Sequence, residues 1–215
     1  MTYAVKEIFY TLQGEGAHAG RPAVFCRFSG CNLWSGREQD RSSAVCQFCD
    51  TDFIGVNGVG GGKFESAEDL AAAIDRSWST AVSDKAQGRK FVVCTGGEPL
   101  LQLGTALIEA LHHLDFEIAV ETNGTVSAPD GIDWLCVSPK AGAQLLQRSG
   151  DELKLVFPQP LLPPSELEHL AFKRLYLQPM DGPNRILNTE LAVRYCLDHP
   201  AWRLSLQTHK ILGIP

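Results

Sequence analysis

The sequence predicts an α/β fold, a partial (incomplete) βα barrel of the TIM type, and three observations support this prediction. Short apolar runs alternate with amphipathic segments of helical period, as in βα units around a parallel sheet. Some apolar runs are followed by segments too short or too proline-rich for a helix, as at residues 158–164. The chain has 215 residues, whereas a complete eight-unit barrel typically needs about 250. We therefore expect a barrel that is left open.

The predicted strands are the short apolar runs, because a run of four to eight such residues bounded by turn residues is typical of a buried strand. In chain order these runs are residues 23–28, 91–94, 117–121, 134–137, 153–157, 175–177 and 204–206.

Three helices are expected between the strands. Ser66 followed by Asp69 resembles a capping pair that opens a helix over residues 67–77. Residues 105–114 carry leucine and isoleucine at helical spacing, and an asparagine is expected to cap a helix over residues 188–197.

We expect residues 1–215 to form one domain with a long loop and insert, residues 30–62, after the first predicted strand. The glycine-rich part of this loop, residues 55–63, is expected to be a flexible connector rather than a phosphate loop, because no hydroxyl residue follows its lysine.

Composition narrows the classes of function. The formal net charge of −6 argues against a large binding surface for nucleic acid or anionic lipid. No apolar stretch is long enough to span a bilayer, and the first residues lack the pattern of an export signal. We therefore expect a cytoplasmic protein with neither a nucleic acid nor a membrane as its partner.

Three of the seven cysteines, Cys31, Cys46 and Cys49, lie on the loop after the first predicted strand. Thiolates gathered on a loop are typical of soft-metal ligation, and three of them leave one position of a four-ligand centre open. A zinc site completed by a histidine or an aspartate is the alternative. The remaining cysteines are expected to be buried structural thiols: Cys26, Cys94, Cys136 and Cys196.

Polar or glycine-containing segments follow four of the predicted strands, at residues 29–31, 95–99, 121–124 and 138–140. Each alone is typical of an ordinary turn. Because the carboxyl ends of parallel strands meet at one edge of the sheet, we expect the four segments to form one site together with the cysteine loop.

The cysteine trio, which ends in Cys46-x-x-Cys49, and the later Gly-Gly-Glu-Pro segment resemble the radical S-adenosylmethionine superfamily. In that superfamily three cysteines hold a 4Fe–4S cluster whose fourth iron binds S-adenosylmethionine. Cleavage of the bound S-adenosylmethionine yields a 5′-deoxyadenosyl radical. The usual motif has three residues between its first two cysteines, whereas 14 separate Cys31 from Cys46. The cost of closing a loop grows slowly with length, so the longer excursion is compatible with one cluster.

Over nearly its whole length the chain resembles the 7-carboxy-7-deazaguanine synthase family, some of whose members carry such an insert. The matching segments are residues 8–16, 27–34, 49–52, 138–140, 177–179 and 206–210. The resemblance implies a lyase of queuosine biosynthesis that converts 6-carboxy-5,6,7,8-tetrahydropterin into 7-carboxy-7-deazaguanine with loss of ammonia. It also implies Mg²⁺ as a cofactor, a flavodoxin-like electron donor and a homodimer.

The same resemblance implies the site residues, with no side chain as the catalytic group because the radical comes from S-adenosylmethionine. The implied cluster ligands are Cys31, Cys46 and Cys49. The implied S-adenosylmethionine site comprises Phe48, Asp50, Gly97, Glu98, Ser138, Lys140 and Gln178. The implied substrate site comprises Leu12, Gln13, Gly14, Arg27, Thr95, His209 and Pro215. Thr51 is the implied Mg²⁺ ligand, with Asp50 and Asp52 as alternatives. Glu121 is expected in the cofactor wall.

Chemistry agrees with two of these roles. The guanidinium of Arg27 can bind the substrate carboxylate through two hydrogen bonds. The last nine residues are apolar for a chain end, so we expect them to pack over the site, with His209 near the substrate and the Pro215 carboxylate at the pterin amino edge.

Two other functions remain open at this point. The first is a glycyl-radical activating enzyme that acts on a protein partner. The second is a non-catalytic zinc or iron–sulfur binding module, which would leave the Gly-Gly-Glu-Pro segment without a role.

Overall fold

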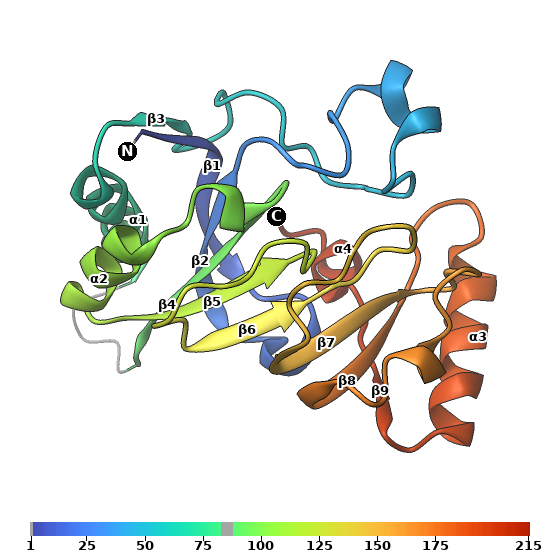
Figure 1. Ribbon diagram of the computed structural model, residues 1–215. Coiled ribbons are helices and arrows are strands. Elements are labelled where there is room, and N and C mark those ends of the chain that lie inside the picture. Colours follow the sequence, from blue (N-terminus) through green and yellow to red (C-terminus); the bar gives the residue numbers. More distant parts are fainter. Residues whose placement is uncertain (1, 83–87) are drawn as a thin grey trace.

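The computed structural model describes residues 2–82 and 88–215, which form a nine-stranded mixed sheet (Figure 1). The strands follow one another across the sheet in the order β3–β1–β2–β4–β5–β6–β7–β8–β9. Their bounds are β1 Tyr3–Leu12, β2 Pro22–Phe28, β3 Gly62–Phe64, β4 Lys90–Gly96, β5 Phe116–Thr122, β6 Trp134–Val137, β7 Ser149–Phe157, β8 Ala171–Pro179 and β9 Trp202–Leu204.

The sheet is mostly parallel and is not closed. β2 and β4 to β9 run parallel, whereas β1 is antiparallel to both β2 and β3. The carboxyl ends of the parallel strands therefore lie along one edge of the sheet, where α/β proteins bind their ligands. The α/β class and the seven predicted strands are confirmed, although β9 begins and ends two residues earlier than expected. β1 and β3 were not predicted, so the cysteine loop follows the first parallel strand rather than the first strand.

α1 and α2 pack against the part of the sheet that contains β1, β2 and β5, whereas α3 packs against β8 and β9 (Figure 1). Their bounds are α1 Ala67–Ala81, α2 Thr105–His113, α3 Arg185–Asp198 and α4 Thr208–Leu212. The predicted cap of α1 is confirmed, because the Ser66 hydroxyl accepts from the Asp69 N–H at 3.1 Å. α4 was not predicted. In the described part of the chain, none of the helices is long and apolar enough to cross a membrane.

The predicted start of α3 was wrong. The helix begins at Arg185, after Asn184, whose side chain makes no capping hydrogen bond. Asn188 instead lies one turn inside the helix, where it is buried and donates to the Met180 carbonyl at 2.9 Å.

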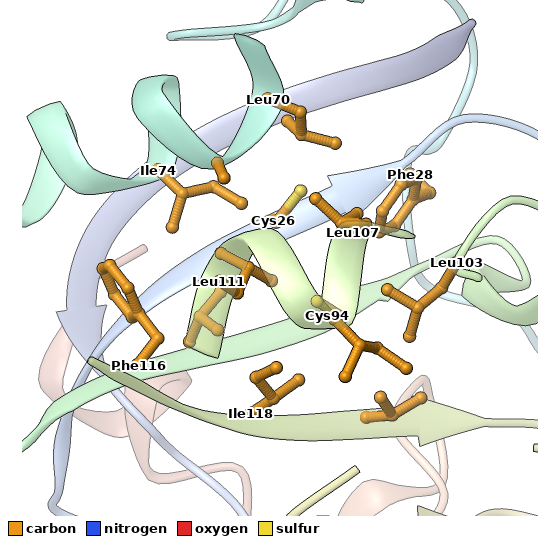
Figure 2. Packing of buried hydrophobic residues seen from close by; sticks show 14 of the residues in the cluster. Cys26, Phe28, Leu70, Ile74, Cys94, Leu103, Leu107, Leu111, Phe116 and Ile118 are labelled. Carbon is orange, nitrogen blue, oxygen red and sulfur yellow. The ribbon is translucent and has the colours of Figure 1, made fainter. Parts of the chain in front are cut away.

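The main core lies between α1, α2 and the strands β2, β4 and β5 (Figure 2). Ile74 of α1 and Leu111 of α2 are fully buried there, beside Cys26 and Cys94. Each fully buried aliphatic side chain contributes roughly 1.5–3 kcal/mol. A second cluster, which includes Leu155 of β7, lies beneath α3. Three of the four predicted structural cysteines are buried, and Cys196 is half-buried.

The glycine-rich segment before α1 is packed rather than flexible, which corrects the expectation for residues 55–63. A Cβ atom at Gly61 would lie 2.2 Å from the Lys6 carbonyl oxygen, so only glycine fits beside β1. Gly58 donates to the same carbonyl at 2.9 Å, and Ile8 donates to Val59 at 2.7 Å. These contacts hold the end of the long loop against β1.

Candidate functional site

A cavity of about 380 Å³ opens at the carboxyl ends of the parallel strands. Its volume lies within the range of roughly 300–1,000 Å³ that is typical of small-molecule sites. The predicted cluster, S-adenosylmethionine, Mg²⁺ and substrate residues all line this cavity, with Glu98 as the exception. The structure therefore brings together residues that are up to 203 positions apart in the sequence, from Leu12 to Pro215.

The insert between the first two cysteines closes on itself. The Val45 and Cys46 N–H groups donate to the Leu33 carbonyl at 3.1 and 3.4 Å. Within the insert, the short helix η2 (Glu38–Ser43) carries Arg41, whose guanidinium donates to the carbonyls of Gln47 at 2.8 Å and Cys49 at 3.0 Å. These hydrogen bonds fix the end of the insert so that Cys46 and Cys49 line the same cavity as Cys31.

The three cysteine thiols that line the cavity differ in their pKa values. The hydrogen bond between Cys46 and Cys49 raises the pKa of Cys46, which donates, and lowers the pKa of Cys49 to about 6. Burial raises the pKa of Cys31. Among the described residues, no three His, Cys, Asp or Glu side chains are arranged to coordinate one metal ion. The set of donors, three sulfurs on one cavity wall with one thiolate favoured, nevertheless fits an iron–sulfur cluster in its chemistry.

The glycine pair after β4 lies directly against the start of the cysteine loop. A Cβ at Gly97 would lie 1.9 Å from the Gly30 carbonyl oxygen, and one at Gly96 would lie 2.2 Å from that of Phe28. Gly96 also has a φ of 133°, which disfavours any other residue. Glycine is thus required at both positions, because the backbone of the two loops is in contact.

Glu98 is absent from the cavity lining formed by the described residues, so its contact with S-adenosylmethionine stays a prediction. Its side chain is fully buried, and its carboxylate accepts from the Leu100 N–H at 2.9 Å, the Thr122 hydroxyl at 2.8 Å and the Asn123 N–H at 2.7 Å. Burial raises its pKa, although these donors oppose the shift. Glu98 therefore ties the turn after β4 to the end of β5, beneath the cavity wall.

Lys140 contributes a cation beside the cysteines. Its ammonium donates to the Ser138 carbonyl at 2.7 Å and hydroxyl at 2.6 Å, and lies 5.9 Å from the centre of the Phe48 ring. Burial lowers the pKa of Lys140, whereas the nearby Cys46 and Cys49 sulfurs raise it. This side of the cavity can accept a carboxylate next to an aromatic face.

Arg27 and Gln13 also line the cavity. The Arg27 Nε donates to a Glu7 carboxylate oxygen at 2.7 Å, and within the described residues its two terminal nitrogens make no hydrogen bond. The Gln13 side chain is buried and donates to Glu121 at 3.1 Å. Arg27 can therefore bind a substrate carboxylate without losing its partner.

Two aspartates flank the residue predicted to bind Mg²⁺. Asp50 accepts from Gln207 at 3.3 Å and forms an ion pair with Lys210 at 2.6 Å. Asp52 forms an ion pair with Lys6 at 2.8 Å. Both carboxylates thus have cationic partners, whereas the Thr51 side chain lines the cavity and makes no hydrogen bond with another described residue.

The C-terminal segment lies over the cavity. The Thr208 N–H and hydroxyl donate to the Gly14 carbonyl at 3.0 and 2.9 Å, and the Thr11 hydroxyl donates to a carboxylate oxygen of Pro215 at 3.0 Å. His209 packs so closely that a Cβ at Gly14 would lie 2.2 Å from its Nδ1. The expected packing of this segment is thus observed.

Replacing Gly14 with alanine should displace the C-terminal segment. We expect the free energy of unfolding of Gly14→Ala to fall by about 1–3 kcal/mol because of overpacking against His209. Urea unfolding measures this loss. Gly62→Ala is the matched control, because its Cβ would meet only the Phe64 ring, at 3.7 Å. Equal unfolding midpoints for the two variants would contradict the packing.

Several lining residues were not predicted: Glu15, Lys154, Asp181, Gln207 and Lys210. For Lys154, the alternation of residues along the strand could have predicted this position. In residues 152–156 of β7, alternation places Glu152, Lys154 and Val156 on the face opposite Leu153 and Leu155, which are fully buried in the core. A charged residue at that position points toward the cavity.

Comparisons with known proteins show which family the chain belongs to. No family model matches the chain. The chain is 66% identical over 215 residues to a 7-carboxy-7-deazaguanine synthase of Caulobacter vibrioides, and 60% identical over 215 residues to one of Bordetella pertussis, in each case over 100% of both chains. It also resembles the crystal structure of QueE from Escherichia coli, with a TM-score of 0.69 and 27% identity, over 96% of this chain and 94% of that one. The chain therefore belongs to the 7-carboxy-7-deazaguanine synthase family of enzymes.

Proposed function

We propose that this chain is a radical S-adenosylmethionine enzyme that converts 6-carboxy-5,6,7,8-tetrahydropterin into 7-carboxy-7-deazaguanine with loss of ammonia. The observation that carries the proposal is the shared cavity, which is lined by the cysteine trio, by Gly97 and Lys140, and by Gln13 and Arg27. Family membership supports the same reaction. We further propose that residues 1–215 act as one partial-barrel domain.

Cys31, Cys46 and Cys49 would hold a 4Fe–4S cluster. Such a cluster would supply the electron for cleavage of S-adenosylmethionine, and with it the 5′-deoxyadenosyl radical chemistry of the proposed reaction. The protein's part is binding and orientation. Lys140 would bind the methionine carboxylate, and Phe48 would pack near the adenine. The remaining proposed contacts to S-adenosylmethionine come from Asp50, Gly97, Ser138 and Gln178, all of which line the cavity.

The substrate would lie between β1, β2 and the C-terminal segment. Arg27 would bind its carboxylate, and Gln13 with backbone groups of Leu12 and Gly14 would pair with the pterin edge. Thr95, His209 and Pro215 would complete the pocket, with the terminal carboxylate accepting from the pterin amino group. Thr51 would bind Mg²⁺, and the ion would help to orient the substrate carboxylate.

We also propose a cytoplasmic homodimer that receives electrons from a flavodoxin-like protein. Free cysteines at every cysteine position of the described chain support a reducing compartment. The exposed apolar side chains of α3 support an interface, because such patches mark protein contacts. They are Ile186, Leu187, Leu191, Val193 and Leu197.

Turnover of the tetrahydropterin tests the proposed reaction. The chain, reconstituted anaerobically with iron and sulfide, is incubated with S-adenosylmethionine, Mg²⁺, a reductant and the substrate, and the product is identified by mass spectrometry. We expect 7-carboxy-7-deazaguanine and ammonia without any protein substrate. Cleavage of S-adenosylmethionine without this product would argue for a different substrate, such as the protein partner of an activating enzyme.

Extending the chain past Pro215 should weaken substrate binding. Three added glycines would replace the terminal carboxylate at this position with a peptide group, so we expect KM for the tetrahydropterin to rise with little change in iron content. Steady-state kinetics and iron analysis of the extended and original chains check this. An unchanged KM would exclude the proposed role of the Pro215 carboxylate.

A further inference from the structure

A buried lysine joins two carboxylates on the wall of the cavity. The Lys154 ammonium lies 2.5 Å from Glu15 Oε2 and 3.2 Å from Glu121 Oε1. Its side chain is only 5% exposed. A buried ammonium costs much free energy unless it is paired, and here two carboxylates from separate segments provide the pairing.

The groups around Lys154 are strongly interacting. Cys136 faces it from β6, Glu152 lies on its own strand, and Lys140 approaches from the loop after β6. Burial opposes the charge of Lys154, but attraction to Glu121 and Glu15 outweighs burial and holds its pKa well above the usual value. Burial likewise opposes the charge of Glu15, and attraction to Lys154 with its hydrogen bonds lowers the pKa of Glu15 to about 2.

The Glu15 and Glu121 carboxylates also accept hydrogen bonds from other residues that line the cavity. Glu121 accepts from the Gln13 amide at 3.1 Å and from the Thr95 hydroxyl at 3.5 Å. Glu15 accepts from the Gln207 amide at 3.0 Å. Gln13 and Thr95 are proposed substrate residues, and Gln207 immediately precedes α4. Lys154 therefore connects the substrate pocket to the C-terminal segment through two ion pairs.

We propose that Lys154 is a positioning residue for the reaction: its buried ammonium fixes the Glu15 and Glu121 carboxylates, which in turn orient Gln13 and Gln207 for the substrate. This inference rests on the proposed function for its substrate. Without the ammonium, two facing carboxylates would repel each other and release both amides. A proton bound between them would substitute for the missing cation, so the defect should lessen as the pH falls.

The test compares holoenzymes carrying Lys154→Met, Lys154→Arg and Lys173→Met. Lys173 forms an exposed ion pair with Asp151 and serves as the matched control. For Lys154→Met we expect KM for the tetrahydropterin to rise by at least about tenfold at pH 8, more than kcat falls, and to decrease toward pH 6.5. Lys154→Arg should restore a KM with the pH profile of the unmodified enzyme, and Lys173→Met should match that enzyme. Iron content should be equal in all four proteins.

A KM for Lys154→Met with the magnitude and pH profile of the unmodified enzyme would overturn the proposal, as would an arginine variant as defective as the methionine one. If Lys154→Met does not fold, the double variant Lys154→Met/Glu15→Gln, in which a neutral amide replaces one of the two carboxylates, should fold and show a KM close to that of the unmodified enzyme at both pH values. A KM raised about tenfold at pH 8 in this double variant would overturn the proposal. If no protein turns over the tetrahydropterin, the proposed function fails, and titration of the ¹³C-labelled Glu15 carboxyl in the holoenzyme still tests Lys154. In this titration, a Glu15 pKa in Lys154→Met as low as in the unmodified enzyme would overturn the proposal. If the methionine variant is unfolded, Lys154→Arg is titrated instead, and a Glu15 pKa as low as in the unmodified enzyme supports the proposal.

Discussion

Replacing Cys31, Cys46 or Cys49 singly with alanine is expected to reduce bound iron to background after anaerobic reconstitution and to bring turnover below detection. Each replacement removes one of the three thiols that line the cavity in the described part of the chain, so a cluster that has lost a protein ligand has no other thiol there to replace it. Iron and sulfide analysis together with the optical spectrum of the reconstituted protein measures the effect.

Cys196→Ser is the matched control for the cysteine trio, because Cys196 is half-buried in α3, away from the cavity lining. We expect this variant to keep its iron and its activity, with a change in the free energy of unfolding of about 1 kcal/mol. Circular dichroism of all four variants separates loss of the cluster from loss of the fold. Iron lost from Cys196→Ser and retained in the trio variants would overturn the assignment of the ligands.

Replacing Glu98 with leucine is expected to lower the free energy of unfolding by about 3–5 kcal/mol, because three buried donors lose their acceptor. Those donors are the Leu100 N–H, the Thr122 hydroxyl and the Asn123 N–H. The turn that carries Gly97 should loosen with them, so binding of S-adenosylmethionine should weaken as well. Urea unfolding and calorimetric binding measure the two effects.

The variant Glu98→Gln distinguishes support from direct contact. It retains an acceptor for Leu100 and Thr122 but turns an amide donor toward the Asn123 N–H, so a loss of about 1–2 kcal/mol in the free energy of unfolding is expected. If Glu98 instead bound S-adenosylmethionine directly, Glu98→Gln would weaken cofactor binding with unchanged stability. That result would restore the role implied by the family resemblance and reject the one observed here.

The parallel strands could be predicted because each is a buried apolar run, whereas β1 could not. The charged pair Lys6–Glu7 interrupts its apolar residues, and the pairing of β1 with β2 is irregular between Val5 and Glu7. β3 has three residues and is held by its pairing with β1 rather than by a pattern of its own. Elements whose order comes from distant partners leave little signal in the local sequence.

The candidate site could be predicted where a motif fixes the chemistry, as for the cysteine trio and Gly97. The surroundings of two other residues depend on which groups the fold buries beside them, and no motif shows this. Glu98 follows the glycine pair in the sequence, yet its side chain turns away from the cavity to meet buried donors. Lys154 belongs to no motif: strand alternation places its side chain outside the core, but its two ion pairs appear only when the fold brings Glu15 and Glu121 to it.

The most direct test of the central claim compares two preparations of the same chain in one assay for 7-carboxy-7-deazaguanine. One is reconstituted anaerobically with iron and sulfide, and the other is purified in air and loaded with zinc. A cavity in which Cys31, Cys46 and Cys49 hold an iron–sulfur cluster predicts product from the first preparation alone. Product from the colourless, zinc-loaded protein would contradict it.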